Sequence, residues 1–560
     1  MNQSVILTLI LGIHTCQAGN FVVENLNDDG AGSLRAAIVS ANENSDASSI
    51  SFSTDLQSGG PHTIALSSPL VITAPIEIIG PGREVLFISG QDSVSAFLLS
   101  GSTEDNPHRL NSFTVQNGRA TLGGANIRVS GYLELRNCSI LNGQTTATGG
   151  NDADGGGLFH SGGNLLIDAC LFQGNSTIGN VSQGGGVYTE SGTATISNSR
   201  IIGNTTDGSV SEGGGIASRS IMTLENCEIA ENRTLNVFSG GGGIYSDTDT
   251  VIRQCTIVNN SVGTVTGTGG YSIGGAFANV ASGDATFESC TITGNFAPPG
   301  MGQGAGISSI SSGTLSFQNC IVAGNGTSDL DRASQQTIYR DDGFNLFGIV
   351  ANTNLNTTGN RATTSTYGIS DPQLSELDFH GGITRTQIPL PGSPALNDGS
   401  STADSNYDQR GTDFPRLVGA SLDIGACERQ DFTDSDQDGI PNTIEALIPE
   451  LATSDGDLDD DGVSDTVEFR LLGSSAVLDP SLKPSLQLQP ISDGFLFQFP
   501  TTPNREYRVV YNTDLVSPLT AIEEEFQRFT LDSQVTLEIP FEGARAFFFL
   551  EGRIPLEPIE

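Results

Sequence analysis

The stretch Gly155-Gly156-Gly157-Leu158 opens a block of sequence that recurs along the chain as far as Asn325. In each block a run of small residues precedes a Cys or Ser, and an Asn follows five residues later. The third small residue of each run stands at 157, 186, 215, 243, 276 and 306, so the period is 28 to 33 residues. A fixed period of this length is typical of stacked supersecondary units, none of which can bury its apolar face alone.

Each block has the features of strands joined by tight corners. Residues 194–202 (Ala-Thr-Ile-Ser-Asn-Ser-Arg-Ile-Ile) alternate between inward and outward positions, as a strand does. The Gly triplet predicts a corner with positive φ and a close approach between coils. The recurring Asn predicts a left-handed bend whose side-chain amides bond along the stack. Asn142 comes one residue early after Cys138, which predicts an irregular coil, and the insertions 145–154 and 264–272 are expected to project as loops.

The Cys residues indicate packing rather than cross-links. Six of the eight share one position of the repeat, namely Cys138, Cys170, Cys227, Cys255, Cys290 and Cys320, and Ser199 fills the gap. Equivalent positions stack about 4.8 Å apart in parallel sheets. Their Cβ vectors then point the same way, which disfavours disulfide geometry. We therefore predict small buried thiols in an internal stack.

Composition excludes several partners. The 560 residues are too many for one compact core unless they form a repeat array, and 70 Gly with 16% charged residues fits a turn-rich β protein. The balance of 24 Lys and Arg against 64 Asp and Glu gives a net charge of −40. This charge disfavours nucleic acid and anionic membranes as partners. It suits the solubility of an exported protein, and bound cations are a second explanation.

Residues 1–18 are typical of a secretory signal peptide. An apolar core from Val5 to Ile13 precedes Cys16-Gln17-Ala18, a cleavage site before Gly19. The segment has no Lys or Arg, and a lipoprotein reading through Cys16 is the alternative. No later run is long and apolar enough to cross a bilayer. The sequence therefore predicts a secreted or cell-surface protein, exported by this signal.

Residues 19–125 are expected to form an N-terminal cap and the first, irregular coils, before the regular repeats at 126–345. Ser33 is a candidate N-cap for a helix over residues 34–42, where Leu34, Ala37, Ile38 and Ala41 share one face. A short amphipathic helix at this place would cover the open end of the stack.

The same region resembles a known family. Residues 33–38 (Ser-Leu-Arg-Ala-Ala-Ile), 79–82 (Ile-Gly-Pro-Gly) and 86–90 (Leu-Phe-Ile-Ser-Gly) are similar to the opening of bacterial right-handed parallel β-helix proteins, including polymorphic outer-membrane adhesins. Members often have Cys-Ser-Leu-Arg-Glu, whereas Gly32 and Ala36 replace the Cys and Glu here. The resemblance spans residues 20–430. It implies an all-β fold, a pectin-lyase-like solenoid with a helical N-terminal cap.

A second resemblance covers residues 346–430. The segments 371–374, 391–395, 408–411 and 423–428 are similar to the C-terminal part of exported β-helix proteins called choice-of-anchor domains. This resemblance implies a segment that closes the helix. We expect Asp408 and Arg410 to form a buried ion pair rather than a functional site, and Cys427 to be unpaired.

Residues 431–475 contain two copies of the calcium-loop pattern. Each copy places oxygen ligands at loop positions 1, 3, 5, 9 and 12, Gly at position 6 and a backbone carbonyl at position 7. The predicted ligands of Ca²⁺ are Asp434, Asp436, Asp438, Ile440, Asn442 and Glu445 in the first loop, and Asp457, Asp459, Asp461, Val463, Asp465 and Glu468 in the second. The alternative is an acidic, disordered linker.

The paired loops resemble thrombospondin type 3 repeats and, more loosely, dockerin modules, which usually lack the Glu at position 12. The resemblance implies a Ca²⁺-rigidified spacer that leads to the last region. Residues 476–560 have strand candidates at 495–499, 507–511, 534–539 and 546–550, which predict a small β-sandwich. It is either an anchoring or binding module or a plain terminal cap.

The expected fold class also suggests a second function, that of an enzyme acting on polysaccharides. Polysaccharide lyases need Asp ligands for Ca²⁺ beside a basic residue, and hydrolases need clustered carboxylates. His108, His160 and His380 are isolated in the sequence, and the close pairs at 152/154, 247/249 and 340–342 lie in expected turns. There is no Trp to stack on sugars. We therefore favour a non-catalytic protein for adhesion or extracellular ligand binding, with a polysaccharide or surface protein as partner. A polysaccharide lyase or glycoside hydrolase of the pectin-lyase-like class is the alternative.

Overall fold

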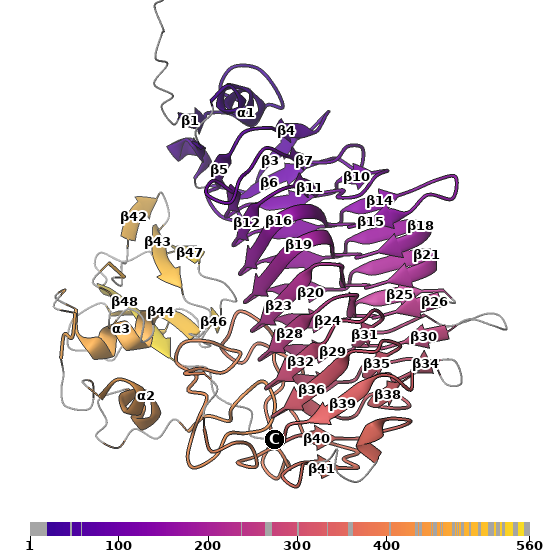
Figure 1. The fold of residues 1–560 in the computed structure, drawn as a ribbon. Helices are drawn as coiled ribbons and strands as arrows, with labels where there is room; N and C mark the ends of the chain where they lie inside the picture. Colours follow the sequence, from indigo (N-terminus) through magenta and orange to yellow (C-terminus); the bar gives the residue numbers. More distant parts are fainter. Residues whose placement is uncertain are drawn as a thin grey trace, which may run out of the picture.

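The computed structural model describes residues 19–431, except 45–46, 58, 237, 264–270, 299–301, 333, 357–361 and 403–404, and discontinuous stretches from 435 to 553. The predicted signal peptide lies outside the described residues. Within them the chain winds into a parallel β solenoid with three sheets, to which the central turns each contribute strands (Figure 1). We name these sheets A, B and C.

Sheet A has 20 strands, sheet B 12 and sheet C nine. The strands of sheet A are β1 (Asn20–Val23), β2 (Ser48–Phe52), β4 (Leu70–Ile72), β5 (Ile76–Ile79), β7 (Phe97–Leu99), β8 (His108–Asn111), β11 (Ile127–Ser130), β12 (Leu133–Arg136), β16 (Leu158–Asp168), β19 (Val187–Ser197), β22 (Ile216–Ser218), β23 (Ile221–Glu225), β27 (Ile244–Ser246), β28 (Thr250–Arg253), β31 (Phe277–Asn279), β32 (Ala285–Glu288), β35 (Ile307–Ser309), β36 (Thr314–Gln318), β38 (Leu330–Arg332) and β39 (Ile338–Asp341). Those of sheet B are β3 (His62–Ala65), β6 (Leu86–Ser89), β9 (Thr114–Gln116), β13 (Ser139–Leu141), β17 (Leu171–Gln173), β20 (Arg200–Ile202), β24 (Glu228–Ala230), β29 (Thr256–Val258), β33 (Thr291–Thr293), β37 (Ile321–Val322), β40 (Leu346–Phe347) and β41 (Thr366–Tyr367). Those of sheet C are β10 (Arg119–Ala120), β14 (Gln144–Thr146), β15 (Ala153–Asp154), β18 (Ser176–Gln183), β21 (Thr205–Glu212), β25 (Arg233–Leu235), β26 (Phe238–Gly240), β30 (Tyr271–Ile273) and β34 (Gly302–Gln303).

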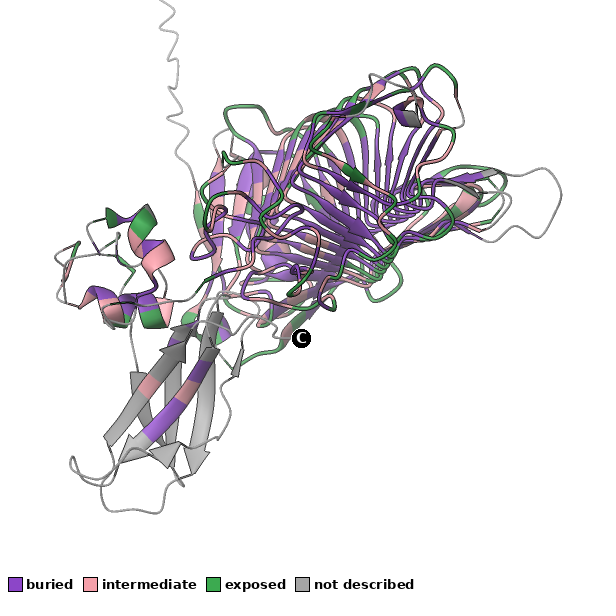
Figure 2. Ribbon diagram, turned by 90° about the horizontal axis from the view of Figure 1, so that it is seen from below, coloured by how far each residue is buried: buried purple, intermediate pink, exposed green. Residues whose placement is uncertain are grey.

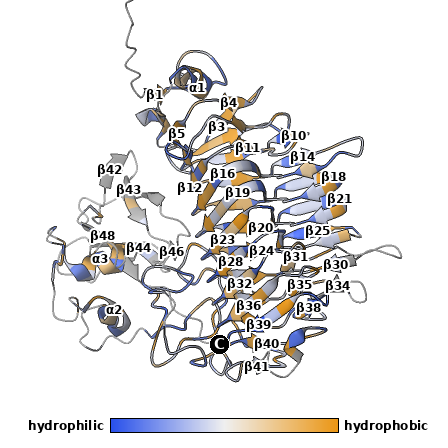
Figure 3. Cartoon of the chain, in the orientation of Figure 1, coloured by the Kyte–Doolittle hydropathy of each residue, from blue (hydrophilic) through white to orange (hydrophobic). Residues whose placement is uncertain are grey.

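The core fills the inside of the coils, where buried residues line the stack (Figure 2). Ile196, Leu224 and Ile252 occupy one register in successive strands of sheet A, and none is exposed. Apolar residues are concentrated on the strands of sheets A and B, while sheet C is more polar (Figure 3). Each coil buries its apolar side chains only against its neighbours, which is the reason the repeat needs stacking.

The strand expected over 194–202 is in fact two strands. β19 ends at Ser197 and β20 begins at Arg200, because Asn198 between them adopts φ 49°. Ala194, Ile196, Ser199 and Ile201 are nevertheless all buried. The inward–outward alternation was therefore correct, but it continues around a left-handed bend from sheet A to sheet B.

The recurring Asn residues form a buried ladder between sheets B and C. Asn204, for example, donates its side-chain amide to Asn232 Oδ1 at 2.9 Å, and Asn232 donates to Asn260 Oδ1 at 3.0 Å. The predicted amide bonding along the stack is confirmed. The left-handed residue is instead the one before, such as Gly203 at φ 62° or Asn259 at φ 57°, because the ladder Asn must point inward.

The coil around Asn142 is irregular, as predicted. Asn142 itself takes the left-handed position, at φ 52°, and Gly143 stands where the ladder Asn would be. The missing amide comes from Asn126, which donates to Asn175 Oδ1 at 3.2 Å. The ladder therefore continues with a side chain from elsewhere in the chain.

The Gly triplets form the corners between sheets C and A. The first Gly has positive φ, for example 60° at Gly213. At Gly214 an added Cβ would lie 2.5 Å from Gly242 O of the next coil and 2.5 Å from Arg233 N. The corner therefore requires both the conformation and the absence of a side chain, as the sequence predicted.

The six described Cys residues of the repeat are all buried and form no disulfide. The amide of Cys138 donates to Cys170 Sγ at 3.4 Å, and that of Cys170 donates to Ser199 Oγ at 3.0 Å. Ser199 thus fills its place in the ladder, as expected. Cys427 is likewise buried.

The expected N-terminal helix forms as α1 (Leu34–Asn42), followed by the 3-10 turn η1 (Thr54–Leu56). Ser33 Oγ accepts from Ala36 N at 3.2 Å, and Leu34, Ala37, Ile38 and Ala41 are buried. Asn42 connects the helix to strand β4, because its side-chain Nδ2 donates to Val71 O at 2.9 Å. The helix lies at the first-coil end of the stack (Figure 1).

The expected loop insertions are in part strands. Residues 145–154 contribute to β14 and β15 of sheet C, and the end of the second insertion enters β30. Residues 264–270 of that insertion lie outside the described residues. Parallel pairing with β18, as at Asp154 opposite Gln183, explains the extended conformation.

Sheet B ends with β40 and β41, next to the 3-10 turn η2 (Asn354–Asn356). The segment that we expected to close the helix then runs along its side, against the outer face of sheet B. Arg385 forms an ion pair of 2.6 Å with Glu228 of β24, and Thr256 Oγ1 of β29 donates to Gln409 Oε1 at 2.6 Å. The expected pair of Asp408 and Arg410 is present at 2.7 Å, with neither side chain exposed.

Beyond residue 431 come two helices, α2 (Asn442–Leu447) and α3 (Asp465–Leu472), and two antiparallel sheets. One sheet contains β42 (Gln487–Ile491), β43 (Gly494–Thr501) and β47 (Ser533–Pro540). The other contains β44 (Glu506–Asn512), β45 (Thr520–Ala521), β46 (Gln527–Arg528) and β48 (Phe547–Arg553). These strands include the four that the sequence predicted. No helix in the described part of the chain is both long and apolar enough to span a membrane.

Candidate metal centre and two surface sites

The second predicted calcium loop folds its acidic side chains toward one point. Carboxylate oxygens of Asp457, Asp459 and Asp461 all lie within 4.8 Å of one another. The backbone holds this arrangement, since Asp461 N donates to Asp457 Oδ1 at 2.9 Å and Val463 N donates to Asp461 Oδ1 at 2.8 Å. The loop therefore curls around its own side chains, as the spacing predicted.

Helix α3 supplies the last two acids of the loop. Asp465 N donates to Gly456 O at 2.9 Å, and Asp465 Oδ1 accepts from Leu458 N at 2.8 Å. Glu468, one turn later, is 0% exposed, and neither of its carboxylate oxygens accepts a hydrogen bond from the described residues. Burial, followed by the charges of Asp459 and Asp461, raises the pKa of Glu468 to about 7.

These residues fit a hard cation. A buried carboxylate without a hydrogen-bond donor is costly, and three further carboxylates beside it increase the cost. A divalent ion with oxygen ligands would remove both penalties. Glu468, Asp457, Asp459 and Asp461 therefore have the donor chemistry of a Ca²⁺ site.

The first loop is described only in part. Asp434, Asp436 and Asp438 lie outside the described residues. Ser435 N donates to Asn442 Oδ1 at 3.0 Å, which matches the bond from Leu458 N to Asp465 Oδ1 in the second loop. Glu445 follows in α2, and the side chain of Ile440 is buried. The described half of the first loop thus has the same turn as the second.

The two loops share a small core and contact the last region. Ile440, Ile444 and Phe469 belong to one buried cluster, which joins α2 to α3. The hydroxyl of Tyr507 in β44 donates to Leu471 O of α3 at 2.5 Å. The conformation of the second loop is therefore coupled to the first loop and to the C-terminal strands.

A second group of side chains lies at the Gly corners, and we name it the corner cluster. On sheet A, Phe159, Tyr188, Ala217 and Tyr245 stand in one register on successive coils. On sheet C, the residues that precede each Gly triplet are in register too, and include Asp154, Gln183 and Glu212. The corner cluster is thus a column of rings beside a column of polar side chains.

Acids with raised pKa values face these rings. Burial, then Asp152, raises the pKa of Asp154 to about 6, and burial also raises the pKa of Glu212. Asp247 forms an ion pair of 3.4 Å with Arg219, whose guanidinium lies 5.8 Å from the Tyr188 ring centre. The corner cluster therefore contains carboxyl groups whose pKa values are raised toward neutral pH.

The close sequence pairs Asp152/Asp154 and Asp247/Asp249 do not predict this grouping. The structure instead aligns Asp154, Gln183 and Glu212 on successive coils of sheet C, because each immediately precedes a Gly triplet. Asp247 lies on the sheet A side of a later corner. The residue before each triplet was the signal in the sequence that could have revealed Glu212.

A polar groove of about 510 Å³ lies at the bend between sheets A and B. It is lined by Glu225, Asn226, Arg253, Gln254, Glu288 and Ser405. Arg253 Nε donates to Glu288 Oε2 at 2.5 Å, and its Nη1 lies 3.5 Å from Glu225 Oε1. The groove is therefore bounded by the solenoid on one side and by the lateral C-terminal segment on the other.

The histidines and Arg340, which the sequence offered as further candidates, make contacts that serve the fold. His108 and His160 are completely buried, and each ring Nε2 lies 3.0 Å from a backbone carbonyl oxygen. His380 Nδ1 lies 3.1 Å from Thr386 Oγ1. Arg340 forms an exposed ion pair of 2.8 Å with Asp342.

Comparison with known proteins agrees with the fold. Residues 95–371 match the family model described as a right handed beta helix region. None of the curated proteins matches the chain. The match and the three parallel sheets together define a right-handed β-helix repeat protein. This fold is compatible with pectin-lyase-like proteins and does not by itself assign an activity.

Proposed function

We propose that this chain is an exported, non-catalytic β-helix protein that serves adhesion or extracellular ligand binding. In this proposal the signal at residues 1–18 directs export, and the rigid solenoid presents its outer faces to a polysaccharide or a surface protein. A linker similar to thrombospondin type 3 repeats binds Ca²⁺ and fixes the geometry of the C-terminal strands. The long stack of hydrogen-bonded coils supports the scaffold role, because it holds surface side chains at fixed positions.

The calcium part of the proposal is carried by Glu468. Its carboxylate is buried beside Asp457, Asp459 and Asp461 and accepts no hydrogen bond from the described residues. In the second loop the ion would be held by these four side chains, by Asp465 and by the Val463 carbonyl. Bound Ca²⁺ would offset part of the loop's negative charge and order α3, whose Leu471 carbonyl accepts from Tyr507.

The test is calorimetric titration of the full chain with Ca²⁺. We expect uptake of one ion per loop and at least tenfold weaker binding to the second loop in Glu468→Gln. Glu104→Gln, an exposed acid on the solenoid, is the matched control and should bind like the unchanged chain. Chelation should also lower the melting temperature. Absence of Ca²⁺ uptake, or equal weakening in both variants, would reject the calcium linker.

The alternative function is a polysaccharide lyase or glycoside hydrolase, and the corner cluster is the observation that favours it. Asp154, with a pKa of about 6, and Glu212 are the acids that could exchange protons with a bound sugar. The test is turnover of a panel of neutral and acidic polysaccharides. Turnover that is lost in Glu212→Gln and kept in Glu104→Gln would replace the non-catalytic proposal.

A further inference from the structure

The bends between sheets A and B carry a second ladder of polar side chains, on the outside of the solenoid. The residue before each buried Cys or Ser adopts a left-handed conformation, with φ between 47° and 55° at Asn198, Asn226, Gln254, Ser289 and Asn319. Because the next side chain points inward, this one points outward. We name these five residues the outer ladder.

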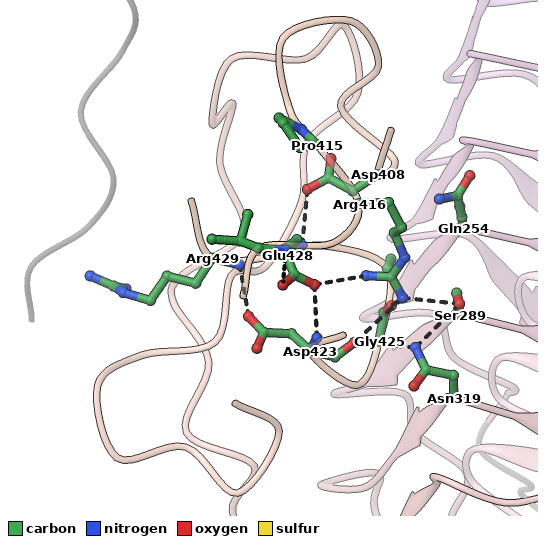
Figure 4. A network of polar contacts seen from close by, with 12 residues as sticks. Gln254, Ser289, Asn319, Asp408, Pro415, Arg416, Asp423, Gly425, Glu428 and Arg429 are labelled. Carbon is green, nitrogen blue, oxygen red and sulfur yellow. Dashed lines mark hydrogen bonds and ion pairs between the residues drawn. The ribbon is translucent and has the colours of Figure 1, made fainter. Parts of the chain in front are cut away.

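The chain's own C-terminal segment already binds to one half of the outer ladder. Gln254 Nε2 donates to Tyr407 O at 2.7 Å, and Asn319 Nδ2 donates to Asp423 O at 3.1 Å. Figure 4 shows this half, where the Arg416 guanidinium donates to Ser289 Oγ at 3.0 Å. The outer ladder therefore binds main-chain carbonyl groups and a guanidinium of an irregular segment made of turns.

The other two members of the outer ladder, Asn198 and Asn226, lie on earlier coils, where the segment continues over sheet B with Phe379 on Arg200 and Arg385 on Glu228. The groove of about 510 Å³ lies beside Asn226, and Ser405 forms part of its boundary. Asn226 Nδ2 donates to Asn198 Oδ1 at 3.2 Å. The Asn226 side chain is partly exposed, and its Oδ1 accepts no hydrogen bond from the described residues. A donor that enters the groove would satisfy this acceptor.

The groove offers more acceptors than donors. Glu225 and Glu288 share the single guanidinium of Arg253, and the longer contact, 3.5 Å to Glu225, leaves that carboxylate with spare acceptor capacity. The side chain of Glu225 is 44% exposed. The net charge of −40 adds a field that attracts cations. The matching ligand is therefore rich in donors and positively charged.

We infer that this groove binds an extended, Arg- or Lys-bearing peptide segment of a partner protein. The partner's main chain donates to Asn226 Oδ1, and its basic side chain pairs with Glu225. The chain's own segment provides the precedent, since Arg385 pairs with Glu228 at 2.6 Å on the same side of the solenoid. A neutral oligosaccharide could also donate to these acceptors, but it has no positive group that would pair with the Glu225 carboxylate.

The probe is the peptide acetyl-Gly-Arg-Ser-Arg-Gly-amide, titrated into the full chain at low and at physiological salt with Ca²⁺ held constant. Charge-assisted hydrogen bonds are among the stronger ones in proteins, so Glu225→Gln should weaken binding about tenfold. The same peptide with citrulline in place of Arg should bind at least tenfold more weakly to the unchanged protein. Glu190→Gln, an exposed acid elsewhere on the solenoid, is the matched control and should leave the affinity unchanged.

Three results would overturn the inference. Equal weakening in Glu225→Gln and Glu190→Gln would mean that the peptide responds only to net charge. Equal binding of the citrulline peptide would remove the role of the cation, and tighter binding of maltotriose would assign the groove to sugars. Equal melting temperatures of both variants establish that folding is not the cause. The groove lies outside the calcium loops, so this test can fail while the calcium test succeeds.

Discussion

Arg416 and Glu428 form an ion pair of 3.5 Å between side chains that are 0% and 1% exposed. Glu428 also accepts from Val418 N at 3.0 Å and from Asp423 N at 2.7 Å, so its carboxylate holds both ends of the backbone turn 418–423. Arg416 in turn contacts Ser289 of the solenoid. This pair therefore connects the fold of the lateral segment to its attachment on sheet B (Figure 4).

Removing one member of the pair should release the lateral segment. We expect Glu428→Gln to cost about 3–5 kcal/mol, because it removes a buried carboxylate that pairs with the Arg416 guanidinium. Hydrogen exchange of residues 405–430 and urea unfolding measure the effect. The double variant Arg416→Met, Glu428→Leu should be less destabilised than Glu428→Gln alone. A single variant as stable as the unchanged protein would contradict the structural role of the pair.

The Gly corners should tolerate no side chain. We expect Gly214→Ala to cost about 3 kcal/mol or more, since its Cβ would lie 2.5 Å from backbone atoms of neighbouring coils. Gly203→Ala is the control, because Gly203 has positive φ, 62°, which Gly214 does not, and nothing lies within 4 Å of its added Cβ. That variant should lose about 1 kcal/mol. Similar losses in both would mean that the close approach of the coils at Gly214 costs no more than a positive φ, and would contradict this prediction.

The buried Asn ladder should contribute more stability than the outer ladder. Asn232 Oδ1 accepts from Asn204 N at 3.0 Å and Nδ2 at 2.9 Å, and its own Nδ2 donates to Ile201 O at 2.7 Å. Asn232→Ala leaves these buried groups without partners and should cost about 3 kcal/mol in thermal or urea unfolding. Asn198→Ala, on the half-buried outer ladder, should cost about 1 kcal/mol. A larger loss of stability in Asn198→Ala than in Asn232→Ala would contradict the greater contribution of the buried ladder.

Acid should destabilise the solenoid through His108. Burial lowers the pKa of its imidazole to about 4, whereas an unfolded His has a pKa of about 6.5. Between these values the unfolded chain binds a proton that the folded chain does not, so stability is complete above about pH 6.5 and falls as the pH drops toward 4. The loss should reach about 3 kcal/mol.

Urea unfolding at pH 7 and pH 4.5, compared between the unchanged chain and His108→Gln, isolates this contribution. The variant should lose less stability than the unchanged chain over that interval. Parallel pH profiles in the two proteins would show that His108 is not the group responsible.

Local and periodic sequence patterns were sufficient to predict much of this fold. The helix at Ser33, the buried Cys stack, the Gly corners and the amide ladder each depend on near neighbours or on the same position one period later. The acidic cluster of Asp457, Asp459 and Asp461 belongs to this class as well, because these residues lie within one short loop. Short-range spacing therefore predicted the solenoid and the closeness of these acidic side chains, while calcium binding stays a prediction.

Other features depend on which coil stacks on which, and only the tertiary structure decided them. Asp154, Gln183 and Glu212 form one column because each coil advances by one strand spacing and returns its corner to the same edge. Arg416 reaches Ser289, 127 residues earlier, because the lateral segment runs back along sheet B. A sequence pattern records the period of a coil but not the inter-coil neighbours of a variable side chain. The repeats thus specified the scaffold, whereas its surface sites arose from stacking and from the return of the chain.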